Sequence, residues 1–238
     1  MLKAVFFDAA GTLIAPREPV AESYARIARE YGVAANVADV SAAFRRVFHA
    51  AAGLAFGPGH APEELRRRER TWWREVVAAT FAGLGSFTDF DSYFNTLFAF
   101  FADTANWAAD PAAAPALAGL KQRGLSLGII SNFDYRLYAI LEGLGLRGYF
   151  DSVTISSEAG YAKPAAEVFR AALKRHQVAG GEAVHVGDSE HMDFTGAAAA
   201  GIGAILIDHG LRERISVKGR GARVASLAAV IEAAEKLA

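Results

Sequence analysis

The sequence contains no cysteine. Disulfide bonds, thiolate nucleophiles and cysteine-ligated zinc are therefore excluded, and a reducing compartment is allowed. The chain also lacks an excess of either charge, because 25 basic and 26 acidic side chains give a formal net charge of -1. No general positive field would hold a polyanion, so we do not expect nucleic acid as a partner.

Long apolar runs are also missing. The run that begins at Leu2 meets Asp8 too early to form the core of a signal peptide. The longest stretch of small apolar residues, 196–207, is shorter than the roughly 20 residues that a transmembrane helix requires. We expect a soluble protein that has no membrane partner and works in the cytoplasm.

What is present is typical of a folded α/β protein. Hydrophobic residues make up 53% of the 238 residues and charged residues 21%, which excludes a disordered chain. Short apolar segments that end in Gly, Asp or Ser alternate with helical patterns, which predicts a doubly wound, Rossmann-like parallel sheet. The predicted strands cover residues 3–8, 125–131, 152–156, 183–187 and 203–208.

The first two predicted strands are separated by more residues than one crossover helix requires, so we expect an inserted domain between them. Residues 16–107 look helical, and a stripe of apolar side chains from Phe90 to Phe101 has helical spacing. The predicted division is a catalytic core of residues 1–15 and 108–238 with a helical cap of residues 16–107. Residues 53–62, rich in Gly and Pro, are predicted to break the cap into two helical pairs. The basic segment 212–223 is predicted to be a mobile loop.

Polar residues end or follow several of the predicted strands, and ligands bind at the carboxyl ends of strands in open α/β sheets. A carboxylate nucleophile, a lysine and hydroxyl or amide donors are suited to phosphoryl transfer, in which fixed positive charge neutralises the phosphoryl oxygens. Two carboxylates could hold Mg²⁺, and a tight turn could direct backbone amides to the site. The candidates are Asp8, Gly11, Thr12, Ser131, Asn132, Lys163 and Asp188.

Four motifs follow one another along the chain, namely Phe6 to Leu13, Ile129 to Asn132, Lys163 with Pro164, and Val186 to Asp193. They resemble those of haloacid dehalogenase superfamily hydrolases with a helical cap, in particular the haloacid dehalogenase-like hydrolase domain-containing group. The resemblance implies that Asp8 is the nucleophile, that Mg²⁺ is the cofactor, and that its ligands include Asp8, Asp188 and the backbone carbonyl of Ala10. Asp193, counted with this metal set, would hold Lys163 or a metal-bound water.

The first motif departs from the pattern of the phosphatases in this superfamily, which carry Asp two residues after the nucleophile. This chain has Ala10 there, and a methyl group cannot shuttle the proton that the leaving group needs. The leading hypothesis is a magnesium-dependent phosphohydrolase that acts on a small phosphate ester or acyl phosphate through an aspartyl-phosphate intermediate. The alternatives are a C-halogen hydrolase and a binding or regulatory protein that has lost turnover. The partner is a small-molecule substrate, and the protein is a monomer or a homodimer.

For two further polar residues near these motifs we predict a role in the fold and not in catalysis. Asp134 is predicted to cap the helix that begins near Tyr135. His185 lies inside a predicted strand, and we interpret it as a core histidine that is not a ligand.

Overall fold

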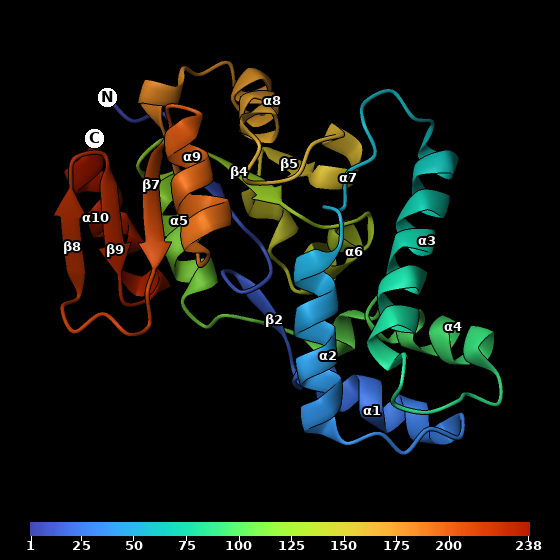
Figure 1. The fold of residues 1–238 in the computed structure, drawn as a ribbon. Coiled ribbons are helices and arrows are strands. Elements are labelled where there is room, and N and C mark those ends of the chain that lie inside the picture. Colours follow the sequence, from blue (N-terminus) through green and yellow to red (C-terminus); the bar gives the residue numbers. More distant parts are fainter. The chain divides into compact units, whose positions relative to one another are not determined.

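The computed structural model describes all 238 residues, and the chain divides into two compact units. The first unit contains Met1–Ala15, Gly53–His60 and Ala109–Ala238, and the second contains Pro16–Ala52 and Ala61–Ala108. Gly53–His60, a segment of the predicted cap, therefore belongs to the first unit. Figure 1 shows the elements of both units, coloured along the sequence.

The first unit is built on a seven-stranded sheet in the order β5-β4-β1-β6-β7-β9-β8. Every neighbouring pair is parallel except β8 and β9, which are antiparallel. The strands are β1 (Ala4–Phe7), β4 (Ser126–Ser131), β5 (Ser152–Ile155), β6 (Ala183–Gly187), β7 (Gly203–Ile207), β8 (Ile215–Lys218) and β9 (Gly221–Val224). All five strands predicted from apolar runs are present, which confirms the α/β fold class.

The basic segment 212–223 was wrongly predicted to be a loop. It forms most of the β8–β9 hairpin at the edge of the sheet, in which Val217 pairs with Ala222. Only β9 buries side chains, at Ala222 and Val224. Its apolar residues, Ile215 and Val217 in β8 and Ala222 and Val224 in β9, alternate with polar ones, so the hairpin lacks the continuous apolar run by which the central strands were predicted.

Helices cover the sheet of the first unit. On one face, Phe6 of β1 and Ile130 of β4 share a buried cluster with Val168 and Phe169. Side chains alternate along a strand, so Phe7 points to the opposite face of the sheet. The helices α5 and α10 pack against each other. The helices of this unit are α5 (Ala113–Gln122), α6 (Arg136–Gly143), α7 (Ser156–Ala159), α8 (Ala166–His176), α9 (Gly196–Ala199) and α10 (Val230–Leu237). Short helical turns are η2 (Arg147–Tyr149), η3 (Gly180–Glu182), η4 (Glu190–Thr195) and η5 (Leu227–Ala229).

The second unit is helical, and its four α-helices form two sequential pairs separated by residues 51–61, as predicted. Tyr93 is fully buried among aromatic rings, and its hydroxyl donates to the backbone carbonyl of Tyr24 at 3.3 Å. The helices are α1 (Val20–Glu30), α2 (Val37–Ala50), α3 (Pro62–Phe81) and α4 (Phe90–Phe100), with the turn η1 (Thr104–Asn106). Strands β2 (Ile14–Pro16) and β3 (Trp107–Ala109) pair where the chain passes between the units. No helix of the structure has both the length and the apolar composition that crossing a membrane requires.

The segment Gly53–His60 is held to the first unit by specific contacts. The buried hydroxyl of Ser156 donates to the backbone carbonyl of Leu54 at 2.6 Å, and the side chain of Leu54 is buried. The amide of Gly57 donates to the carbonyl of Gly160 at 3.2 Å, and a Cβ atom at Gly160 would lie 2.4 Å from the carbonyl carbon of Gly57. The segment therefore lies against the loop that precedes Lys163.

Candidate active site at the carboxyl edge of the sheet

Three neighbouring strands bring the first candidates together. β1 lies between β4 and β6, with Phe7 in register with Ile129 on one side and Val186 on the other. Asp8 follows β1, Ser131 ends β4 and Asp188 follows β6, so all three lie at the carboxyl edge of the sheet. The predicted convergence of these residues thus has a simple origin in the strand order.

Lys163 is held against two carboxylates in the loop between α7 and α8. Its ammonium nitrogen lies 2.8 Å from Oδ1 of Asp8 and 2.5 Å from Oδ1 of Asp193, and the lysine is 4% exposed. Burial acts to lower the pKa of Lys163, but the charges of Asp8 and Asp193 outweigh it, so that the pKa is raised. Lys163 is therefore a fixed cation beside the candidate nucleophile.

Asp193 is fixed on both carboxylate oxygens. Oδ1 accepts from Lys163 and lies 2.9 Å from Nε2 of His185, while Oδ2 accepts from the amide of Ser189 at 3.0 Å. Burial acts to raise the pKa of Asp193, but the charge of Lys163 and the contact with His185 hold it well below its usual value. With these partners Asp193 holds Lys163, one of the two roles predicted for it.

Glycine at position 187 makes room for this carboxylate. A Cβ atom there would lie 2.2 Å from Cγ of Asp193, which is closer than any carbon contact allows. The last residue of β6 therefore has to be glycine for Asp193 to reach Lys163.

Asp188 completes a group of three carboxylates. Oxygen atoms of Asp8, Asp188 and Asp193 all lie within 4.8 Å of one another, and the hydroxyl of Thr12 donates to Oδ1 of Asp188 at 3.2 Å. Loss of hydration raises the pKa of Asp188, and the negative charges of Asp8 and Asp193 raise it further. Because Asp188 is exposed to solvent, we attribute its raised pKa to the neighbouring charges more than to the loss of hydration.

Asn132 has a different position from the one expected of a substrate ligand. Its Oδ1 accepts from the amide of Lys163 at 2.7 Å, and its Nδ2 donates to the carbonyl of Lys163 at 2.9 Å. Two of its hydrogen-bonding atoms thus hold the backbone of the lysine loop. The hydroxyl of Ser131, in contrast, makes no hydrogen bond within the chain and is free for a ligand.

The tight turn after Asp8 does not offer the amides that the sequence suggested. The amide of Gly11 donates to the carbonyl of Ile14 at 2.9 Å, and that of Thr12 donates to the carbonyl of Ala9 at 3.2 Å. The free amides in this turn are those of Ala9 and Ala10, and the carbonyl of Ala10 accepts no hydrogen bond. Gly11 has φ +94°, and a Cβ atom there would lie 2.6 Å from Oδ2 of Asp188, so its role in the structure is steric.

Two residues that received structural interpretations have side-chain partners that the sequence did not indicate. Asp134 accepts from the amide of Arg136, the second residue after it, and also from its guanidinium at 2.9 and 2.6 Å, with both residues buried. It therefore belongs to a buried ion pair as well as to the start of α6. His185, interpreted as a core histidine, contacts Asp193, a partner eight residues away that no sequence pattern indicates.

The site thus combines three carboxylates with one buried ammonium group, and its net negative charge suits a divalent cation. Oxygen ligands of this kind are preferred by hard ions such as Mg²⁺. Together with the parallel sheet and the helical unit inserted after its first strand, these features define an α/β protein with an acidic site at the carboxyl ends of its strands. Residues 2–201 match the family described as haloacid dehalogenase-like hydrolase. The chain belongs to this family.

Known relatives agree with this assignment. The mouse haloacid dehalogenase-like hydrolase domain-containing protein 3 is 36% identical over 214 residues, which cover 87% of this chain and 82% of the mouse protein. Phosphoserine phosphatase from Thermus thermophilus is 40% identical over 115 residues, covering 48% of this chain and 46% of that enzyme. The structure of L-2-haloacid dehalogenase from Xanthobacter autotrophicus with covalently bound chloropropionic acid has a TM-score of 0.72 at 20% identity, with 100% of both chains covered. This last similarity concerns the fold.

Proposed function

We propose that the protein is a magnesium-dependent phosphohydrolase in which Asp8 attacks the phosphorus of a small phosphate ester or acyl phosphate. The observation that carries the proposal is the contact between the buried ammonium of Lys163 and Asp8 at 2.8 Å. A cation fixed beside a carboxylate nucleophile can neutralise phosphoryl oxygens as they approach that nucleophile. The similarity to a phosphatase over about half of the chain supports the same reaction.

The carboxylates that would hold Mg²⁺ are Asp8 and Asp188, with the free carbonyl of Ala10 as a further ligand. Asp193 is less suited to direct ligation, because both of its oxygens already accept hydrogen bonds from the chain. When bound, the ion would supply positive charge to the phosphoryl group and reduce the repulsion between the carboxylates. The raised pKa of Asp188 is consistent with this assignment, since besides loss of hydration it reflects the negative charges of Asp8 and Asp193.

Phosphate oxygens would be bound by donors that have no partner within the chain. These are the hydroxyl of Ser131 and the amides of Ala9 and Ala10. Lys163, which is already paired with Asp8 and Asp193, would add positive charge beside the phosphate. Gly11 and Asn132 would act on the site indirectly, the first by leaving space for Asp188 and the second by holding the Lys163 loop. Thr12 would orient Asp188 through its hydroxyl.

The substrate class follows from Ala10. General acid catalysis by a positioned side chain contributes about 10²- to 10⁴-fold, and alanine cannot supply it. Acyl and aryl phosphates have leaving groups that depart without protonation, so we propose that these activated phosphates are cleaved faster than alkyl phosphates. A water molecule then hydrolyses the aspartyl phosphate: the phosphorus–oxygen bond to Asp8 breaks, inorganic phosphate leaves and the carboxylate is restored.

The test measures release of phosphate from acetyl phosphate, an aryl phosphate and an alkyl phosphate, with Mg²⁺ and with a chelator. We expect magnesium-dependent turnover that is fastest for acetyl and aryl phosphate, and none in Asp8→Asn, whose amide cannot act as the nucleophile. Beryllium fluoride should bind the wild-type protein in the presence of Mg²⁺ but not the Asp8→Asn variant.

Two results would contradict the proposal. Metal-independent release of halide from 2-haloacids, with no phosphate release, would assign the protein to C-halogen hydrolysis. Absence of both reactions, with phosphate esters bound but unchanged, would assign it to ligand binding without turnover.

A further inference from the structure

His185 is a fully buried histidine in β6 that the proposed reaction does not use. It pairs with Phe6 of β1, and the ring of Phe169 meets it edge-on at 5.2 Å between centroids. Its Nε2 lies 2.9 Å from Oδ1 of Asp193, while its Nδ1 is buried without a hydrogen-bond partner. One end of the ring thus faces the apolar interior and the other faces the site.

These contacts decide which nitrogen carries the hydrogen. The carboxylate of Asp193 also accepts from the ammonium of Lys163 and the amide of Ser189, so it acts as an acceptor towards His185 as well. Nε2 must therefore donate. A hydrogen on Nδ1 would be a buried donor without an acceptor, which is costly, so the ring is the neutral Nε2–H tautomer.

The hydrogen bond connects His185 to the nucleophile through two further residues. Oδ1 of Asp193 accepts from both His185 and Lys163, and the ammonium of Lys163 also contacts Asp8. The distances along this chain of contacts are 2.9, 2.5 and 2.8 Å. A shift of the Asp193 carboxylate would therefore change where the lysine charge lies relative to Asp8.

We propose that His185 is a positioning residue, which holds the carboxylate of Asp193 by donation from Nε2 and thereby keeps the ammonium of Lys163 against Asp8. The proposal rests on the phosphohydrolase function for its effect on turnover, but the contact itself does not depend on that function. His185 touches neither substrate nor the reacting atoms.

The kinetic test compares His185→Leu, which removes the donor, with His185→Gln, whose side-chain amide can replace Nε2–H. We expect kcat for an aryl phosphate to fall about 10- to 100-fold in His185→Leu, as for other residues that orient ligating groups. KM should change little, and His185→Gln should recover most of the lost rate. A rate in His185→Leu equal to that of the wild type, or a Gln variant as slow as the Leu variant while folded, would overturn the proposal.

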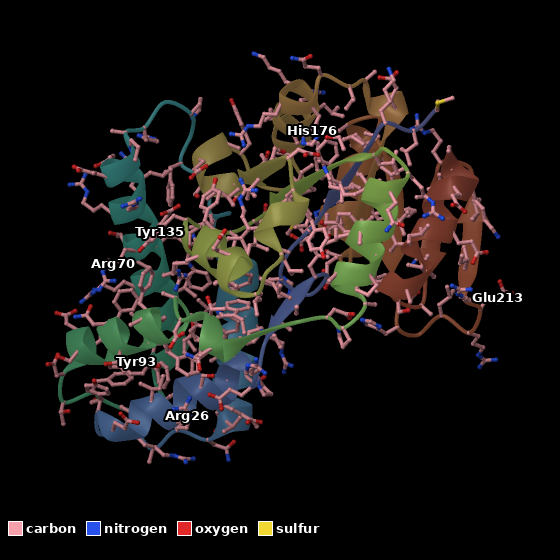
Figure 2. All side chains as sticks on the ribbon, turned by 180° about the vertical axis from the view of Figure 1, so that it is seen from behind. Arg26, Arg70, Tyr93, Tyr135, His176 and Glu213 are labelled. Atoms are coloured by element: carbon pink, nitrogen blue, oxygen red, sulfur yellow. The ribbon has the colours of Figure 1, made fainter.

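His176 offers a matched control at the other edge of the sheet. Its ring nitrogens lie 2.8 Å from the hydroxyl of Ser126 and 2.6 Å from that of Ser152, the first residues of β4 and β5, and the ring of Phe6 meets it at 4.8 Å. His176 is labelled in Figure 2. His176→Leu also removes hydrogen bonds of a histidine in the core unit, but we expect its kcat to remain that of the wild type. An equal loss in both Leu variants would indicate a general structural effect and overturn the proposal.

A spectroscopic test separates this inference from the proposed function. Long-range ¹H–¹⁵N correlation spectra should show His185, assigned by its absence in the Gln variant, as the Nε2–H tautomer. The ammonium resonance of Lys163 should be observable in the wild type and in His185→Gln, and broadened or shifted in His185→Leu. An Nδ1–H tautomer, or an unchanged lysine resonance in the Leu variant, would overturn the positioning role even in an active enzyme. The expected spectra in a protein without turnover would contradict only the proposed function.

Discussion

The ammonium nitrogen of Lys163 lies 2.8 Å from Oδ1 of Asp8, in a contact where the two side chains are 2% and 11% exposed. Removing one partner of a buried ion pair typically costs about 3–5 kcal/mol, because the other charge is left without compensation. We therefore expect Lys163→Met to lower the free energy of unfolding by about this amount and to abolish turnover. Urea denaturation at neutral pH measures the first effect.

The exposed Lys174, on α8, provides the control for this substitution. Lys174→Met should change the free energy of unfolding by less than about 0.5 kcal/mol. In the background of Asp8→Asn, Lys163→Met should cost less than in the wild type, since one of the two carboxylates has lost its charge. Equal costs in both backgrounds would show that the lysine and Asp8 do not interact.

Asp188→Asn should stabilise the protein in the absence of divalent metal. The pKa of Asp188 is raised above its ordinary value of 3.8, so the folded protein binds a proton that the unfolded chain has already released. The stability contributed by this group therefore falls as the pH rises from about 3.8 through the raised pKa. Thermal unfolding measured from acidic to neutral pH should show this decline in the wild type and a smaller one in Asp188→Asn.

Binding of Mg²⁺ should offset the destabilisation that the ionised carboxylate of Asp188 causes. At 100 times the dissociation constant, an ion that binds only the folded state stabilises it by about 2.7 kcal/mol. We expect Mg²⁺ to raise the melting temperature of the wild type, but not that of Asp188→Asn. The idea of a metal at Asp188 would be abandoned if both proteins responded equally.

Gly187→Ala should disturb the site more than the fold. The added methyl would lie 2.2 Å from Cγ of Asp193, so the carboxylate has to move away from Lys163. Overpacking of this kind typically costs about 1–3 kcal/mol, and we expect the kcat of any phosphatase activity to fall as well. Gly148→Ala is the matched control, because a Cβ atom there meets nothing within 4 Å. A Gly187→Ala variant with unchanged stability and rate would contradict the steric argument.

Ala10→Asp should restore the missing proton donor. If only general acid catalysis is absent, turnover of an alkyl phosphate should rise by up to about 10²- to 10⁴-fold, while that of an aryl phosphate changes little. The measurement is the dependence of the rate on the pKa of the leaving group in both proteins. Equal rates for alkyl and aryl phosphates in the wild type would show that another residue already supplies the proton.

The sheet could be predicted from the sequence because its central strands are buried on both faces. Each is a short apolar run that ends in a polar residue at one edge, so Asp8 and Asp188 could be expected near each other from the strand pattern alone. The β8–β9 hairpin could not be predicted in this way. It lies at the edge of the sheet, and its outer strand, β8, has no buried side chain.

The side-chain partners within the site depend on distances that the sequence does not contain. Asn132 looks like a substrate ligand, but its amide is bonded to the backbone of Lys163, thirty-one residues further on. The amide of Gly11 looks available, but the turn closes so that it donates to Ile14. His185 reads as part of the core because it alternates with valines in a strand, although its polar end reaches Asp193.

The docking of Gly53–His60 on the sheet unit has a consequence for attempts to exchange the inserted helices between relatives. Joining residue 15 directly to residue 109 would delete this segment, leaving the buried hydroxyl of Ser156 without its acceptor and removing the buried side chain of Leu54. A graft that keeps residues 53–60 with the recipient, and replaces only the two helical pairs on either side, would preserve these contacts. The insertion therefore consists of two separately exchangeable helical pairs, and residues 53–60 of the recipient chain lie between them in the sequence.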